Sequence, residues 1–432
     1  MELLEITILI LTFVILLAVG VPISFSIGIS SLATMLISIN TIPSFTTVAQ
    51  RMATGLDSFA LLAIPFFILA GQLMNSGGIA RRLIDFAKVL VGKLPGGLAF
   101  VNIMAAMLFG AISGSAVAAA SAIGGFMTPV MKKEGYDPGF SAAVNITSST
   151  TGLIIPPSNI LIVYSLASGG VSIAALFLAG YIPGIIIGLS LMIVSGIYAK
   201  RSDYKVKLDI TFGYAVKKFL DAIPSLLLII IVIGGIVAGY FTATEASAVA
   251  VLYAFILSVF IYREVKLKDL PKILLNSVTT TAIVMLLVGT SMAMSWVMAY
   301  ENIPQNVAAA LLALSDNGIV ILLIINLILL VIGTFMDMTP AVLIFTPIFL
   351  PIAIQLGIDP IHFGIFMVMN LSIGLCTPPV GSVLFVGCSV ADLPITKVIK
   401  PLIPMFIAMI ISLLLVTYIP ELSLFIPKLF GY

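Results

Sequence analysis

Gly152-Leu-Ile-Ile-Pro-Pro157 and Gly374-Leu-Cys-Thr-Pro-Pro379 are the two stretches that decide the fold. They stand 222 residues apart, and each places a proline pair inside an apolar run. Because proline lacks a backbone N–H and clashes with the preceding helical turn, a helix must break at each pair. Apolar segments broken at corresponding places in two halves of a chain are typical of secondary transporters, which bind substrate and coupling ions at such breaks.

The repeat extends beyond the proline pairs. Pro129, Gly135, Asp137 and Pro138 recur at the same offset as Pro351, Gly357, Asp359 and Pro360. We therefore expect a first inverted repeat over residues 1–200, a cytoplasmic linker over 201–221 and a second inverted repeat over 222–432.

Composition places the chain in a lipid bilayer. Hydrophobic residues make up 61% of the 432 residues, and charged residues only 9%. A soluble protein of this length needs a much more polar surface. The formal net charge of +2, with basic residues in short scattered clusters, argues against nucleic-acid binding. The prediction is an all-α polytopic membrane protein.

Two smaller features fit this class. Cys376 and Cys388 lack the CxxC spacing of a metal or redox site, so we expect them to be buried as small apolar residues. The N-terminal run from Leu3 to Val19 lacks the basic region of a signal peptide and is followed at once by another apolar run. We therefore expect a retained membrane span at this end.

Apolar runs of membrane-spanning length recur along the whole chain. They cover residues 3–20, 23–38, 57–75, 97–131, 138–168, 171–198, 222–240, 245–262, 273–299, 318–353, 360–391 and 401–420. The runs 97–131 and 318–353 are too long for single spans and contain clustered glycines or prolines. We expect each of these two to fold back as a re-entrant hairpin.

Charge supports inverted halves with both chain termini outside. The cytoplasmic segments are then 76–96, 132–137, 199–221, 263–272 and 392–400, and they hold 18 of the 20 basic residues. Only Arg51 and Lys428 fall elsewhere, which is the asymmetry of the positive-inside rule. Residues 78–95 carry four basic residues and are expected to form an amphipathic helix on the inner surface.

Polar residues at membrane depth form two related sets. The first set is Ser113, Gly114, Ser115, Asn145, residues 147–151, Ser158 and Asn159. The second set is Gly333, Thr334, Asp337, Thr339, Asn370, Ser372, Thr377 and Ser382. In the repeat register Ser115 corresponds to Asp337 and Ser148 to Asn370, so we expect the two sets to face each other across one cavity near the midplane.

The chemistry of these sets suits Na⁺ and a carboxylate. Carbonyls freed by proline, together with hydroxyl oxygens, are hard donors, while helix N-termini offer N–H groups to an anion. No Lys or Arg lies at membrane depth in this reading, so bound cations would have to offset the charge of an anionic substrate. Asp337 is an isolated intramembrane acid, which is functional by default as a hydroxyl or amide acceptor, cation ligand or proton site.

Each feature also has a structural explanation. Any single Ser or Thr here can pack helices closely or bond back to its own helix, and Pro-Pro can be an ordinary kink. Thr242-x-x-Glu245 has the spacing of a helix-capping box. His362 and Trp296 lie near outer loops and are expected at the membrane interface.

The motifs Gly110-Ala-Ile-Ser-Gly-Ser115, Ile155-Pro-Pro-Ser158, Thr242-Ala-Thr-Glu-Ala246 and Cys376-Thr-Pro-Pro-Val-Gly381 together resemble a known family. They are similar to motifs of the large membrane (M) subunit of tripartite ATP-independent periplasmic (TRAP) transporters, and the resemblance covers essentially the whole chain. Where the family often has a proline before Thr-Glu-Ala, this chain has Ala243.

The resemblance implies a Na⁺-coupled, elevator-type symporter in the bacterial inner membrane rather than an enzyme. Its transport domain would comprise about 97–168 and 318–391, with the remainder as scaffold. Substrate would contact Ser115, Ser158, Asn159 and Asp337. Na⁺ would bind at Ser113, Gly114, Ser148, Ser149, Thr151, Gly333, Thr339, Gly374 and Thr377.

The resemblance further implies two protein partners, a small integral membrane (Q-type) subunit and a periplasmic substrate-binding (P-type) protein. Family substrates are organic acids. Asp337 favours one with hydroxyl or amide donors, such as sialic acid, over a C4-dicarboxylate, which it would repel unless Na⁺ intervened. A stand-alone Na⁺/anion symporter, an uncoupled channel and an intramembrane aspartyl protease are the alternatives. The protease would need a second carboxylate beside Asp337.

Overall fold

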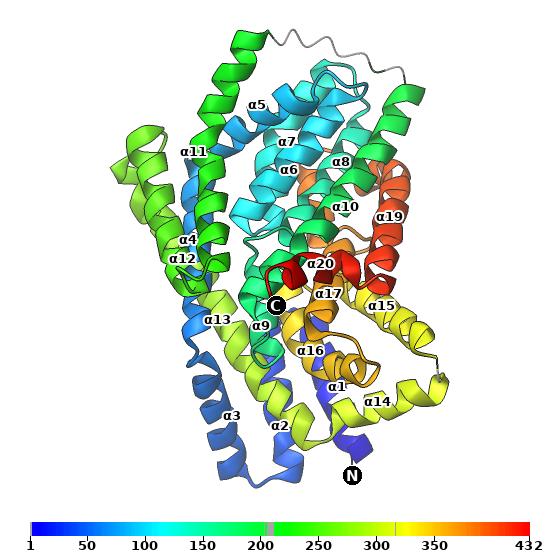
Figure 1. Cartoon of the computed structure of the whole chain (residues 1–432). Coiled ribbons are helices and arrows are strands. Elements are labelled where there is room, and N and C mark those ends of the chain that lie inside the picture. Colours follow the sequence, from blue (N-terminus) through cyan, green and yellow to red (C-terminus); the bar gives the residue numbers. More distant parts are fainter. Residues whose placement is uncertain (1, 203, 205–210, 316) are drawn as a thin grey trace.

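The computed structural model describes residues 2–202, 204, 211–315 and 317–432. Figure 1 shows an all-helical molecule. Eight of the described helices or helical segments are long and apolar enough to cross a membrane. The expectation of an all-α polytopic membrane protein is confirmed.

The first half contains ten α-helices. They are α1 Glu2–Ala18, α2 Ile23–Ser38, α3 Thr41–Leu56, α4 Ala63–Ser76, α5 Ile79–Val91, α6 Gly97–Ser113, α7 Ala116–Lys133, α8 Pro138–Ser149, α9 Asn159–Ala167 and α10 Ile173–Arg201. Helix α3 was not expected, because its sequence is not continuously apolar.

The second half repeats this order with two differences: the single helix α13 stands where the first half has α3 and α4, and one helix is added at the end. Its helices are α11 Phe212–Val237, α12 Ala243–Phe255, α13 Leu270–Tyr300, α14 Ile303–Leu314, α15 Gly318–Phe335, α16 Met338–Gln355, α17 Pro360–Gly374, α18 Ser382–Ala391, α19 Ile395–Tyr418 and α20 Glu421–Leu429. A π-helical segment, Ile256–Ile261, continues α12.

The two halves pack reciprocally. Helices α5 to α10 recur as α14 to α19. The starts of α7 and α16 are 222 residues apart, and so are the starts of α10 and α19. Helix α7 packs on α18 as α16 packs on α9, and α8 packs on α19 as α17 packs on α10. Likewise α4 contacts α12 and α13 contacts α2. A helix of one half thus packs on a helix of the other half, and their counterparts pack on each other in the same way. An approximate two-fold axis between the halves requires this pattern.

Each long apolar run is divided into two packed helices. Gly114 and Ser115 join α6 to α7, and Met336 and Asp337 join α15 to α16. Gly114 has a φ of 62°, which glycine adopts without the steric cost that a side chain would bring. That each pair enters the membrane from one side and returns to it stays a prediction.

The proline pairs interrupt the helices that follow the hairpins. Helix α8 ends at Ser149, a 3₁₀ turn covers Thr151–Leu153, and α9 begins only at Asn159. Helix α17 ends at Gly374, and α18 begins at Ser382. Both Pro-Pro bonds are cis.

Basic segments gather toward one end of the molecule. Figure 1 shows α5, the end of α10 and the start of α11 together, opposite the N-terminus. Helix α5 buries the apolar face that includes Leu83, Ile84 and Ala87, as an amphipathic helix should. Of the expected linker, residues 203 and 205–210 lie outside the described residues. The part from Phe212 onward is already helix α11.

Two of the smaller predictions concern the cysteines and the helix cap at Thr242. Cys376 and Cys388 are buried and free, and Thr242 and Glu245 form the capping box, as expected. Trp296 is half-buried and stacks on Tyr300.

His362 is completely buried inside the protein, and its depth relative to the membrane stays a prediction. Its Nδ1 lies 2.6 Å from Ser423 Oγ and its Nε2 lies 3.1 Å from the Thr417 carbonyl. These two bonds attach α17 to the chain around α20, so the ring serves packing inside the protein.

Candidate functional site: a cavity between two helix bends

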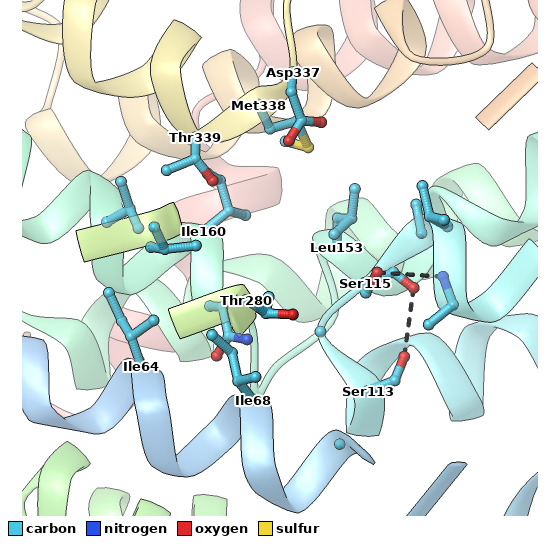
Figure 2. Close-up of a pocket in the computed structure, with 18 of the residues that line it drawn as sticks. Ile64, Ile68, Ser113, Ser115, Leu153, Ile160, Thr280, Asp337, Met338 and Thr339 are labelled. Atoms are coloured by element: carbon cyan, nitrogen blue, oxygen red, sulfur yellow. Dashed lines mark hydrogen bonds between the residues drawn. The ribbon is translucent and has the colours of Figure 1, made fainter. Parts of the chain in front are cut away.

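One cavity of about 380 Å³ lies where the two helix bends meet. Helices α4 and α13 line one side through residues such as Ile64, Ile68 and Thr280, and the α6–α7 bend lines another. The start of α9 and the start of α16 complete it. Figure 2 shows Asp337, Thr339, Ser115 and Ser113 approaching this space from separate elements. The structure thus brings residues of both polar sets together.

Asp337 contributes the only charged side chain among the residues that line the cavity. It is the N-cap residue of α16, yet its carboxylate makes no capping hydrogen bond. It forms no ion pair in the described chain, and it is exposed toward the cavity. An N-cap aspartate normally accepts a bond from its own helix, so this carboxylate is available to a ligand.

The opposite bend is held by short-range contacts. Ser115 is the N-cap of α7 and accepts a hydrogen bond from the Ala118 N–H at 3.2 Å. A Cβ at Gly114 would lie 3.0 Å from Asn159 Nδ2, so the bend lies directly against the start of α9. Ser113, Gly114, Ser115 and Asn159 all line the cavity, together with Thr339.

Ser158 does not reach this cavity. Its side chain is 1% exposed, and its hydroxyl donates to the Leu153 carbonyl. In this conformation the hydroxyl closes the turn before α9, and the expected contact of Ser158 with substrate stays a prediction.

Six of the expected Na⁺ residues lie behind the cavity rather than in its wall. They are Ser148, Ser149, Thr151, Gly333, Gly374 and Thr377. Four of them have hydroxyls that donate to carbonyls three or four residues earlier in the chain: Ser148 and Ser149 to Asn145, Thr151 to Ser148, and Thr377 to Ile373. Their oxygen lone pairs remain able to accept a bond or a cation.

Two glycine pairs place these segments against the bends. A Cβ at Gly152 would lie 2.2 Å from Gly110 Cα, and a Cβ at Gly374 would lie 2.6 Å from Gly333 Cα. Backbone therefore meets backbone in both halves, with no room for a side chain. We call these two close backbone contacts the glycine cradles.

Buried amide oxygens without partners lie in the same region. Asn145 donates to the Ala120 carbonyl and Asn370 to Asn326, yet Oδ1 of both Asn145 and Asn370 lacks a hydrogen-bond partner. Asn102 donates to Ser148 and also keeps a free Oδ1. An unsatisfied buried acceptor costs about 1–3 kcal/mol. An all-oxygen donor set of this kind fits a hard cation.

Three polar residues of the cavity wall were missed by sequence reasoning. Gln72 and Asn75 come from α4, and Thr280 comes from α13. The two polar sets predicted from the sequence lie in the long apolar runs and the segments with the proline pairs, and α4 and α13 belong to neither. Two amides near the end of the otherwise apolar run 57–75 were the signal that could have found two of them.

The described cavity wall offers one carboxylate and no histidine, cysteine or lysine. The described wall of this cavity therefore brings no second carboxylate to Asp337. Hydroxyls, amides and one carboxylate set among isoleucines, valines and leucines can bind a small polar molecule and orient it.

A family model described as "Tripartite ATP-independent periplasmic transporter, DctM component" matches residues 10–422. The chain is 59% identical over 420 residues to Uncharacterized protein YgiK of Salmonella typhimurium, covering 97% of this chain and 96% of that protein.

Two further relatives have names that state a substrate. The chain is 41% identical to the Sialic acid TRAP transporter large permease protein SiaM of Vibrio cholerae, covering 96% of this chain and 97% of that protein. It is 38% identical to the C4-dicarboxylate TRAP transporter large permease protein DctM of Rhodobacter capsulatus, covering 95% and 96%.

A solved structure shares the fold. The crystal structure of the Alcanivorax borkumensis YdaH transporter superposes with a TM-score of 0.65 at 14% identity, covering 89% of this chain and 88% of that chain. The family model and the full-length relatives together establish that this chain belongs to the TRAP transporter family, as its DctM component.

Proposed function

We propose that the protein is the large permease of a system that takes up an organic acid together with Na⁺ across the bacterial inner membrane. The observation that carries this proposal is the cavity itself, in which both helix bends meet and Asp337 presents a free carboxylate. Family membership and the relatives that carry permease names support transport as the activity.

Charge in the cavity supports Na⁺ coupling. The described wall holds Asp337 and no basic side chain, so an anionic substrate would meet a negative site. Two or more co-transported cations near Asn145 and Asn370, beside the two glycine cradles, would offset that charge. The free amide oxygens and the hydroxyl oxygens are the donors that Na⁺ requires.

The same charge favours a hydroxylated substrate. A carboxylate such as Asp337 accepts hydrogen bonds from hydroxyl or amide groups and repels a second carboxylate. We therefore favour a sugar acid such as sialic acid over a C4-dicarboxylate. Both kinds of substrate appear among the names of the relatives, so the test must include both.

The arrangement of the cavity supports an elevator movement. Its wall combines α4 and α13 on one side with the α6–α7 bend, α9 and α16 on the other. A substrate held mainly by the second group would travel with it when that group, about 97–168 and 318–391, slides past the remaining helices. Both chain termini would then stay periplasmic with the static part.

Two protein partners complete the proposal: a small integral membrane subunit and a periplasmic substrate-binding protein. Relatives named as TRAP permeases support a multi-component system. In such a system the soluble protein captures the substrate and presents it to the cavity.

Reconstitution tests the partners and the substrate together. Proteoliposomes containing this chain and its small subunit are given labelled sialic acid or labelled succinate under an inward Na⁺ gradient. Uptake of sialic acid only when the cognate binding protein is present supports the proposal. Uptake without the binding protein favours the stand-alone symporter, and uptake of succinate alone identifies a dicarboxylate system.

A further inference from the structure

Two buried carboxylates meet at one hydroxyl far from the cavity. Ser38, the last residue of α2, places its Oγ 2.9 Å from Glu301 Oε1 and 3.5 Å from Glu5 Oε1. Glu5 lies in the first turns of α1, and Glu301 directly follows α13. Only 3% of Glu5 and 8% of Glu301 is exposed. In Figure 1 these helix ends lie beside the N-terminus, opposite α5.

No counter-charge reaches this cluster from the described chain. Neither carboxylate forms an ion pair there. Arg51 of the adjacent helix α3 places its guanidinium 5.3 Å from the centre of the Trp296 ring instead. Two carboxylates this close repel each other, and the exposed Ser38 between them leaves the cluster accessible to an ion from solution.

A second observation points to a bound ion. Glu5 Oε2 is buried and has no hydrogen-bond partner among the described residues. Ser38 has one hydroxyl proton, which can be donated to only one of the two carboxylates at a time, so this hydroxyl does not satisfy Glu5 Oε2. A bound cation accepts electron pairs from Glu5 Oε2 and from the neighbouring oxygens at the same time.

The repeat supplies an internal comparison. Gly77 follows α4 as Glu301 follows α13, and the next residues, Gly78 and Asn302, share a left-handed backbone with φ of 70° and 54°. A Cβ at Gly77 would clash with Ser258 Oγ. Ser258, in the π-helical segment after α12, thus lies against the end of α4 as Ser38 of α2 lies against Glu301 at the end of α13.

The first-half junction carries its own cation. Arg82 Nη2 lies 3.7 Å from Glu264 Oε1, and the guanidinium lies 3.6 Å from the centre of the Tyr262 ring. Ser258 donates to the Leu73 carbonyl, so no carboxylate meets that hydroxyl. At the second-half junction Glu5 and Glu301 are present, but no basic residue of the described chain forms an ion pair with them.

We propose that Glu5, Ser38 and Glu301 bind a hard divalent cation, Ca²⁺ or Mg²⁺, at the junction of α1, α2 and α14. Two carboxylates and a hydroxyl are the ligands such ions prefer, with water filling the remaining positions. The bound ion ties α1 and α2 to the start of α14, the helix that leads into the α15–α16 pair. This site is separate from the Na⁺ sites and does not depend on the proposed transport activity.

Terbium luminescence tests the site in the full-length protein. The purified chain in detergent is freed of divalent ions with a chelator and titrated with Tb³⁺. Trp296, the single tryptophan, is excited; it stands five residues before Glu301, about 7.5 Å along the helix axis. We expect a saturable signal that Ca²⁺ or Mg²⁺ displaces. Glu301→Gln and Glu5→Gln should weaken Ca²⁺ binding at least about tenfold.

Controls separate the site from general effects. Glu134→Gln removes an exposed carboxylate elsewhere and should leave the titration unchanged. If a Gln variant fails to fold, Glu301→Asp keeps the charge but shortens its reach and should still weaken binding. Ca²⁺ should also raise the Tm of the wild type but not that of Glu301→Gln. The proposal is overturned if neither divalent ion binds saturably at millimolar concentration, or if Glu301→Gln binds like the wild type.

Discussion

Gly110 and Gly152 lie backbone against backbone, so that a Cβ at Gly152 would fall 2.2 Å from Gly110 Cα. Gly333 and Gly374 make the corresponding contact in the second half. The two contacts join each helix bend to the segment that precedes a proline pair. They therefore fix the position of the hydroxyl and amide oxygens that we propose for Na⁺.

Gly152→Ala should separate these two backbones. Because the neighbouring atoms belong to the main chain, they cannot move aside easily, and we expect a loss of about 1–3 kcal/mol in stability and weaker activation by Na⁺. Gly125→Ala is the matched control, since nothing lies within 4 Å of its added Cβ. Thermal unfolding and Na⁺ activation curves measure both effects. Equal behaviour of the two variants would contradict the close contact.

Asp337→Asn should abolish or strongly reduce uptake while leaving the Tm nearly unchanged. The carboxylate has no capping bond or ion pair to lose, so its removal costs the fold little. Asp392→Asn is the control, because it alters an exposed acid at a left-handed position that asparagine accepts. Normal uptake by Asp337→Asn would remove this residue from the site.

Ser115→Ala should change both the KM for substrate and the stability, whereas Ser158→Ala should change the stability alone. Ser115 lines the cavity, so we expect Ser115→Ala to raise the KM for substrate. The missing helix cap should also lower the free energy of unfolding by about 1 kcal/mol. Ser158 is buried and donates a hydrogen bond to the Leu153 carbonyl. Ser158→Ala should therefore lower the free energy of unfolding by about 0.5–1.5 kcal/mol without a change in KM. A raised KM in Ser158→Ala would mean that this serine meets substrate in another conformation.

His362→Phe should destabilise the protein without affecting substrate affinity. The substitution leaves Ser423 Oγ and the Thr417 carbonyl with one partner fewer inside the protein. We expect the free energy of unfolding to fall by about 1–3 kcal/mol. Thermal unfolding together with a KM measurement checks this, and an altered KM at an unchanged Tm would be inconsistent with a structural role.

The main breaks of the fold could be predicted because they rest on local chemistry. Proline pairs must interrupt a helix, and clustered glycines allow the turn at Gly114. Helix α3 could not be predicted in the same way, because its residues are mixed in polarity and gain their helical stability from packing on α2 and α13.

The cavity was predictable in outline but not in its full wall. Ser115 and Asp337 were paired by the repeat register, and both line it. The burial of Ser158 could not be predicted, because its bond to the Leu153 carbonyl depends on how the chain turns after the prolines. Gln72 and Thr280 come from helices outside the repeat motifs and reach the cavity only through tertiary packing. The burial of His362 could not be predicted for the same reason, since α20 covers it from a distant part of the sequence.

Sodium-driven uptake by the reconstituted permease tests the central claim most directly. Proteoliposomes with the small subunit and the binding protein are compared under an inward Na⁺ gradient and an equal K⁺ gradient, for the wild type and for Asp337→Asn. The account predicts accumulation of labelled organic acid above its external concentration with Na⁺ only, lost in Asp337→Asn. Equal accumulation in Na⁺ and K⁺ would contradict it.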